Sequence, residues 1–158
     1  MTDVIIARAL HVLAVVIWIG GVWMVTAVLL PALRRGDFGA DRVAALHAIE
    51  SRFAWQARSA VIVVGATGLY MTWRLDLWSR FHSLEFWWMH AMVGLWTLFA
   101  LVLFIAEPLI VHRHFARLAT RRPEVAFRRL QWAHWVLVVL SLATIFGAVA
   151  GSRGWPIF

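Results

Sequence analysis

The residues best suited to bind a metal or a cofactor are the histidines, because the sequence contains seven of them and no cysteine. The lack of cysteine excludes disulfides, thiolate-bound metals and cysteine-held iron–sulfur clusters. Two histidines, His11 and His90, each lie near the start of a long apolar segment. Imidazole nitrogens are common axial ligands of haem iron, and two of them can hold one iron from opposite sides. The chemistry favoured by these residues is therefore haem ligation.

The spacing of the two histidines from the expected helix starts puts them at the same depth. His11 lies 8 residues after Asp3 and His90 lies 7 residues after Ser83, and both Asp3 and Ser83 suit a helix N-terminus. At 1.5 Å per residue, both rings lie about 11 Å below the helix ends. We predict a haem b with His11 and His90 as axial ligands and with Arg8 beside its propionates. The alternative is a pair of structural histidines that bond to nearby carbonyls or lipid headgroups.

A second pair of histidines, His47 and His134, suggests a second haem near the opposite face. Helix starts are predicted at Asp41 and Pro123, and His47 lies 6 residues after the first whereas His134 lies 11 residues after the second. The difference of 5 residues corresponds to about 7 Å, so the second haem requires the two hairpins to differ in reach. The alternative is that both are solvated histidines. The remaining histidines are competing ligands or interfacial and loop residues: His82, His112 and His114.

The elements that would position these side chains are transmembrane helices. The chain of 158 residues is 63% hydrophobic, and a bilayer core about 30 Å thick needs roughly 20 apolar residues in a helix. Four stretches meet or approach that length, and together they fill most of the chain, at about 4–33, 53–73, 86–111 and 130–150. We expect an all-α, single-domain protein over residues 1–158, folded as an up-down-up-down four-helix bundle in a lipid bilayer.

The positive charge indicates orientation rather than nucleic-acid binding. All fifteen basic residues are arginines; ten of them lie between the first and second or the third and fourth predicted spans, and an eleventh, Arg58, lies just inside the second span. Because basic loops stay in the cytoplasm, both ends of the chain are predicted to lie outside, N-out and C-out.

Two charges inside the apolar runs, Arg58 and Glu107, are expected at matching depths. An unpaired charge in lipid is costly, so we predict an Arg58–Glu107 ion pair. The alternatives are that Arg58 faces a haem propionate or that Glu107 handles a proton. Pro31 and Pro108 fall near the ends of the first and third spans, where a kink or break is tolerable.

Methionines near His90 support a competing hypothesis. The stretch "WWMHAM" contains Met89, His90 and Met92, and Met71 is expected at a similar level. Thioether and imidazole ligands suit copper(I), so a copper site that also uses His11 is the alternative to haem. Methionine is also a common gap-filler in apolar helices.

Two segments resemble the CopD-like family of bacterial membrane proteins, which is related to the HemJ-type proteins. They are "ALHVLAVVIWIGGVWMVTAVLLPALRR" with His11, Trp18, Gly20, Gly21 and Pro31, and "RFAWQARSAVIVVGATGLYMTW" with Arg52 and Phe53. The resemblance implies a helical bundle in the bacterial inner membrane, with haem b in some relatives and copper uptake in others. HemJ-type proteins also use a lysine, and this sequence has none, which counts against porphyrinogen oxidation.

The sequence therefore favours a membrane-embedded cytochrome b that transfers single electrons. An iron with two histidine ligands is coordinatively saturated, which suits electron transfer better than oxygen binding. Quinol is the expected redox partner, and an oxidoreductase activity would follow, although no catalytic residue is identified. The alternatives are a copper-binding or copper-transporting protein and an accessory subunit without a cofactor. The apolar surface is compatible with a homodimer.

Overall fold

The computed structural model of the chain describes residues 1–39, 42–111, 118 and 122–154, and every regular element in these ranges is helical. The all-α expectation is confirmed for them. Three predicted features lie outside the described residues: the helix start at Asp41 and the competing ligands His112 and His114.

The first rod of the fold joins three helical segments end to end. They are α1 (Thr2–Met24), the π-helical η1 (Val25–Leu29) and α2 (Leu30–Arg35). Gly36 ends the rod in the left-handed conformation, with a φ of 87°, which glycine adopts without a steric penalty.

The other elements complete a four-rod arrangement. They are α3 (Arg42–Arg74), the short 3₁₀ helices η2 (Trp78–His82) and η3 (Leu84–Phe86), α4 (Trp87–Leu101), which continues as the π-helical η4 (Val102–Val111), and α6 (Pro123–Ser152). The helix start predicted at Pro123 is confirmed. Asp3 was predicted to cap the first helix, and this is wrong, because α1 begins one residue earlier, at Thr2.

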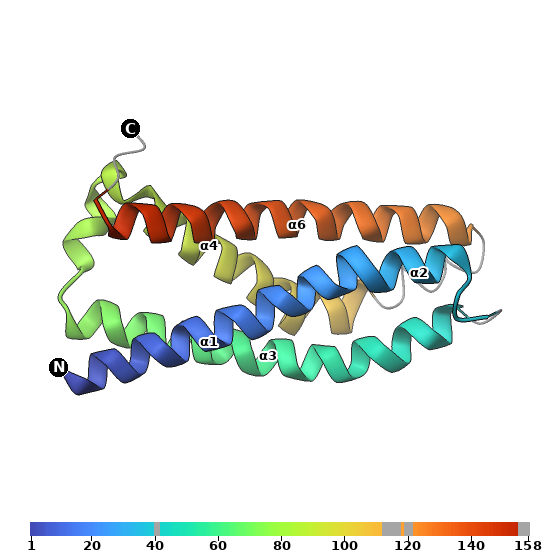
Figure 1. Cartoon of the computed structure of the whole chain (residues 1–158), viewed down its shortest axis with the longest axis horizontal. Helices are drawn as coiled ribbons and strands as arrows, with labels where there is room; N and C mark the ends of the chain where they lie inside the picture. The colour runs from blue at the N-terminus through green and yellow to red at the C-terminus, as the bar shows by residue number, and fades with distance from the viewer. Residues whose placement is uncertain (40–41, 112–117, 119–121, 155–158) are drawn as a thin grey trace.

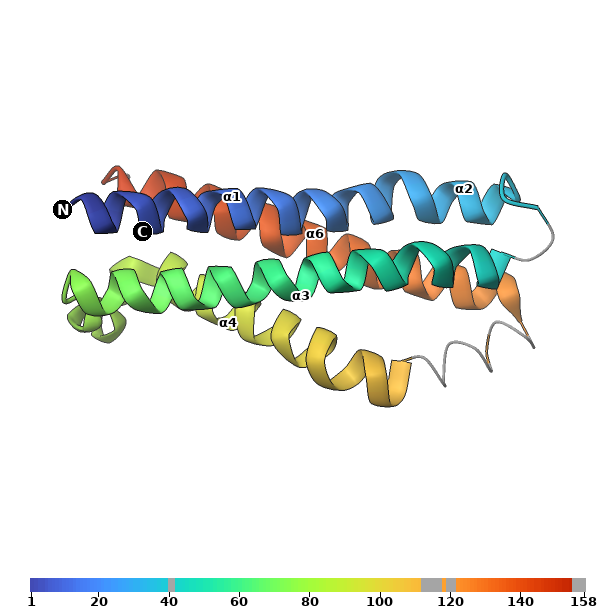
Figure 2. The same ribbon diagram turned by 90° about the horizontal axis from the view of Figure 1, so that it is seen from below.

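Figure 1 and Figure 2 show how the rods lie. The helix α1 packs against α3 and α6, and α4 packs against the same two helices. The rod of α4 and η4 crosses the bundle obliquely: the start of α4 lies beside the end of α6, and η4 packs against α3. The start of α1 and the end of α6 lie at the same end of the molecule.

Three helical segments are long and apolar enough to cross a membrane, which supports a multi-pass membrane protein. They are Thr2–Arg35, Leu84–Glu107 and Glu124–Ser152. The fourth predicted span, 53–73, does not reach the same apolarity. It lies within α3, whose polar side chains include Arg58 and Thr67, and both of these contact neighbouring helices.

Close packing of large aromatic rings against glycine fixes α4 between its neighbours. A β-carbon placed on Gly65 would lie 2.6 Å from the Trp96 ring, and the Trp96 indole donates to the Val61 carbonyl at 2.8 Å. Two similar contacts join α4 to α6, namely Trp87 against Gly147 and Trp88 against Gly151. Small residues thus allow the helices to approach closely.

Candidate functional site

His11 lies in a defined hydrogen-bond chain between α1 and α3. The half-buried ring places Nδ1 2.9 Å from the Thr67 hydroxyl oxygen. The Thr67 hydroxyl itself donates to the Val63 carbonyl at 2.6 Å. Since that hydroxyl has only one hydrogen, its oxygen must accept from Nδ1–H of His11. This tautomer leaves Nε2 of His11 with a lone pair that can bind a metal ion or a proton.

The local sequence explains why His11 faces α3. His11 shares one stripe of α1 with Ala7, Ala14 and Trp18, at spacings of three and four residues, and these three neighbours are buried. On the facing helix, a β-carbon at Gly68 would lie 3.3 Å from Cε1 of the ring. Glycine at this position therefore gives the imidazole room beside the α3 backbone.

His90 has a different environment. Its ring is exposed, with Nε2 3.1 Å from the Phe81 carbonyl and Nδ1 3.3 Å from the Phe86 carbonyl. The ring also packs edge-on against Phe81, with centroids 5.5 Å apart. The described arrangement therefore does not direct His11 and His90 at a common point, because one ring contacts α3 and the other contacts the residues before α4.

The second predicted pair comes from α3 and α6. His134 is half-buried and its Nδ1–H donates to the Leu130 carbonyl at 2.9 Å, which again leaves Nε2 with a lone pair. His47 is half-buried on α3, 5 residues after Arg42, whereas His134 lies 11 residues after the start of α6.

The predicted ion pair between Arg58 and Glu107 is confirmed. One guanidinium nitrogen of Arg58 lies 3.2 Å from Oε2 of Glu107, and both side chains are about 30% exposed. Nε of Arg58 also donates to the Leu103 carbonyl at 3.1 Å. These contacts occupy Arg58, which the sequence also assigned to a haem propionate.

Glu50 is a titratable residue that the sequence analysis missed. Burial, followed by the charge of Glu107, raises the pKa of Glu50 to about 7. The sequence could have indicated Glu50, because it precedes Arg58 by 8 residues and so lies on a similar face of α3, the face predicted to contact Glu107. Its proximity to Glu107 depends on helix packing, which the sequence alone did not reveal.

Arg8 and Arg74, which both lie near the start of α1, differ in their partners. Arg8 is exposed, and within the described residues no carboxylate pairs with it. Arg74 instead donates to Asp3 at 3.1 Å, and the Tyr70 hydroxyl donates to the same carboxylate at 2.8 Å. Asp3 therefore ties α1 to the end of α3.

Two buried indole N–H groups, those of Trp18 and Trp87, have no acceptor among the described residues. Trp18 packs at right angles on Phe99, with ring centroids 4.7 Å apart. A buried donor without a partner is uncommon and favours an additional acceptor nearby.

The described residues contain no cluster of three or more histidine, aspartate or glutamate side chains that could hold a metal ion. For the copper alternative, Met89 is buried, and Met71 and Met92 are half-buried. The structure therefore gives no added support to a copper site built from several carboxylate or imidazole ligands.

No family model, curated protein or solved structure matches the sequence. The resemblance of residues 9–35 and 52–73 to the CopD-like family accordingly stays a prediction. The function proposed below depends on the positions of the side chains.

Proposed function

We propose that this protein is a membrane-embedded haem b protein that carries out one-electron transfer, with His11 as an axial ligand. The hydrogen-bond chain from His11 through Thr67 to Val63 carries the proposal. Ligating histidines nearly always donate their second N–H to a neighbouring acceptor, which fixes the ring and makes the other nitrogen more basic. His11 has this arrangement before any ligand is bound.

His90 is the second axial ligand of the proposal, and it fits less well than His11. Its ring has to turn away from the carbonyls of Phe81 and Phe86 before a nitrogen can face the bundle. A neutral imidazole has one N–H and can donate to only one of these carbonyls at a time, so losing that hydrogen bond costs about 1 kcal/mol. Because His90 is exposed, its ring can make this turn without displacing core side chains.

Two other features support a prosthetic group in this half of the bundle. Arg8 lies one turn from His11 and, within the described residues, has no carboxylate partner, so it can pair with a propionate. The unpartnered indole donors of Trp18 and Trp87 offer hydrogen bonds to a further acceptor.

The remaining features of the proposal follow the distribution of charge. The arginine-rich segments lie in the cytoplasm, with an N-out, C-out, up-down-up-down arrangement in a bacterial inner membrane. A second haem, held by His134 through its free Nε2 and by His47, would lie nearer the cytoplasm. Quinol is the proposed electron donor or acceptor, and a homodimer is compatible with the exposed apolar side chains.

Absorption spectra of the purified, detergent-solubilised protein test the proposal. Haem b is expected to give a Soret band and an α-band after reduction with dithionite. His11→Ala should remove the outer haem, whereas His90→Ala should convert it to a five-coordinate, high-spin form or remove it. A full low-spin spectrum in both variants would reject the assignment, and a colourless protein with stoichiometric copper would favour the copper alternative.

A further inference from the structure

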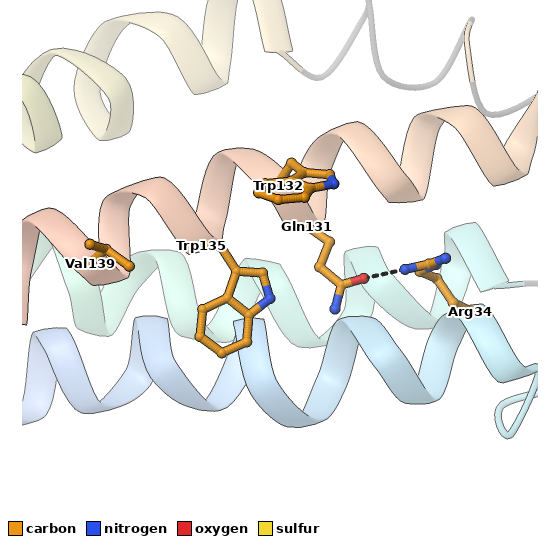
Figure 3. Close-up of a pocket in the computed structure, with 5 residues that line it drawn as sticks. All are labelled: Arg34, Gln131, Trp132, Trp135 and Val139. Atoms are coloured by element: carbon orange, nitrogen blue, oxygen red, sulfur yellow. Dashed lines mark hydrogen bonds between the residues drawn. The ribbon is translucent and has the colours of Figure 1, made fainter.

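A groove open to the surroundings lies between the first rod and α6, at the arginine-rich end of the fold. It has a volume of about 500 Å³ and is lined by one residue from α2 and four from α6: Arg34, Gln131, Trp132, Trp135 and Val139. Figure 3 shows these side chains, with Arg34 reaching across to Gln131. The Arg34 guanidinium donates to the Gln131 amide oxygen at 2.6 Å.

The chemistry of this groove changes along the helix axis. Its polar end holds Arg34 and Gln131, and its apolar end runs past Trp135 to Val139. Gln131 and Val139 are 8 residues apart on α6, so the groove extends over about 12 Å. Both walls belong to segments apolar enough to cross a membrane, and Arg34 lies at the very end of one of them. The groove therefore passes from the headgroup layer into the acyl-chain layer.

Arg34 has no negatively charged partner among the described residues. Its partner Gln131 is a neutral amide, and within the described part of the chain no carboxylate lies within ion-pair distance of it. The neighbouring charges are paired elsewhere, because Arg35 contacts Asp37 at 3.1 Å and Glu124 contacts Arg42 at 2.9 Å. Arg34 is thus an available cation at the polar end of the groove.

The apolar end of the groove has aromatic walls. Trp135 packs at right angles on Trp23 of α1, with centroids 5.7 Å apart, which holds its ring between the two helices. Trp132 and Val139 are 68% and 61% exposed and are available to a lipid chain. Tryptophan is favoured at this level of a membrane because its ring is apolar and its N–H is polar.

We propose that this groove binds one anionic phospholipid, with its phosphate on Arg34 and an acyl chain along Trp135 and Val139. The lipid phosphate is a negatively charged partner for Arg34, and the acyl chain covers the exposed apolar side chains. A neutral quinone ring would leave the guanidinium charge uncompensated, and free phosphate would leave the apolar end uncovered. Basic pockets between membrane helices commonly bind acidic lipid headgroups in this way.

Native mass spectrometry of the full-length protein tests the proposal. The protein is reconstituted in nanodiscs made from equal amounts of anionic phosphatidylglycerol and neutral phosphatidylcholine and is then released into mild detergent. The wild type should retain phosphatidylglycerol in preference to phosphatidylcholine. Arg34→Gln should lower that retention about fivefold, as expected for the loss of one basic residue at a membrane surface.

Three further variants separate charge from structure. Arg52→Gln makes the same change in net charge at an exposed arginine on α3 and should leave retention unchanged. Arg34→Lys and Gln131→Leu each keep the cation at the groove and should keep most of the lipid. Circular dichroism melting curves confirm that each variant is folded, and Arg34→Lys remains informative if Arg34→Gln does not fold.

Several outcomes would overturn the lipid site. They are equal retention of the two lipids by the wild type, an equal loss in Arg34→Gln and Arg52→Gln, displacement of the lipid by inorganic phosphate, and its displacement by added ubiquinone. Persistence of phosphatidylglycerol against both competitors supports the proposal. The haem proposal is independent of these results, because the groove residue Trp135 packs on Trp23, about 18 Å along α1 from His11.

Discussion

Arg58 forms an ion pair with Glu107 and also donates a hydrogen bond to a backbone carbonyl of the helix that carries Glu107. Besides contacting Glu107 at 3.2 Å, Arg58 donates through Nε to the Leu103 carbonyl at 3.1 Å. In a π-helical turn that carbonyl would accept from the residue five positions later, but this residue is Pro108, which has no N–H. The neighbouring helix therefore supplies the donor that the proline cannot.

Arg58→Ala should destabilise the protein by about 2 kcal/mol, because it leaves both the Glu107 carboxylate and the Leu103 carbonyl without a partner. The measurement is thermal denaturation in detergent, followed by circular dichroism. Glu107→Gln in the Arg58→Ala background should recover part of the loss. A double-mutant cycle without coupling between the two positions would show that the ion pair does not contribute.

Thr67→Val should weaken haem binding by about 10–100-fold, because it removes the acceptor that orients the His11 ring. The measurement is titration of the protein with haem, followed at the Soret band. Thr67→Ser keeps the hydroxyl and should restore binding. If Thr67→Val lowers the melting temperature but leaves haem affinity unchanged, Thr67 has only a structural role.

Glu50 should make the protein less stable as the pH rises. Its pKa is about 7 in the folded state, against an ordinary value of 4.5, so the folded state holds the proton more tightly than the unfolded state. The stabilisation is complete below about pH 4.5 and is lost as the pH rises through about 7. Glu50→Gln should therefore stabilise the protein by roughly 2 kcal/mol above about pH 8, allowing for partial exposure, and should have little effect near pH 4.5.

Melting temperatures of the wild type and Glu50→Gln across this pH range check the prediction. Glu85→Gln is the control, because the Glu85 side chain is exposed at the other end of the bundle. A difference between wild type and Glu50→Gln that stays constant with pH would contradict it.

Gly65→Ala should destabilise the protein by about 2 kcal/mol, because the added carbon overlaps the Trp96 ring. The indole cannot move away without losing its hydrogen bond to Val61. Gly94→Ala is the matched control, since a β-carbon there meets no other atom within 4 Å. Gly65→Ala should lower the melting temperature relative to the wild type, and Gly94→Ala should not lower it to the same extent. Equal changes in the two variants would argue against the close contact.

The sequence predicted the helices and the charged pair because few alternatives exist for them. In lipid, a long apolar run forms a helix because its backbone N–H and C=O groups must bond to each other. Two opposite charges at matching depth in such runs are most stable as an ion pair. Pro31 and Pro108 fall where the sequence allows a kink or break, and one π-helical segment contains Pro108 while another ends two residues before Pro31.

The direction of the histidine rings was harder to predict. Counting residues from a helix start gives depth along the axis, but it does not give the rotation of the helix about that axis. The sequence placed His11 and His90 at one depth, while their hydrogen bonds are to α3 and to the residues before α4, respectively. Thr67 and Glu50 were missed because their partners come from other helices, which only tertiary packing brings near.

The contacts between tryptophan and glycine determine how α4 is added to the bundle. Lipid tails are as apolar as the side chains of this helix, so the bilayer exerts no force that would choose among its sliding positions. Trp96 packs on Gly65 of α3, while Trp87 and Trp88 pack on glycines of α6. Only one register satisfies both neighbours at once. After insertion, shape complementarity can therefore contribute to selecting a unique assembled state.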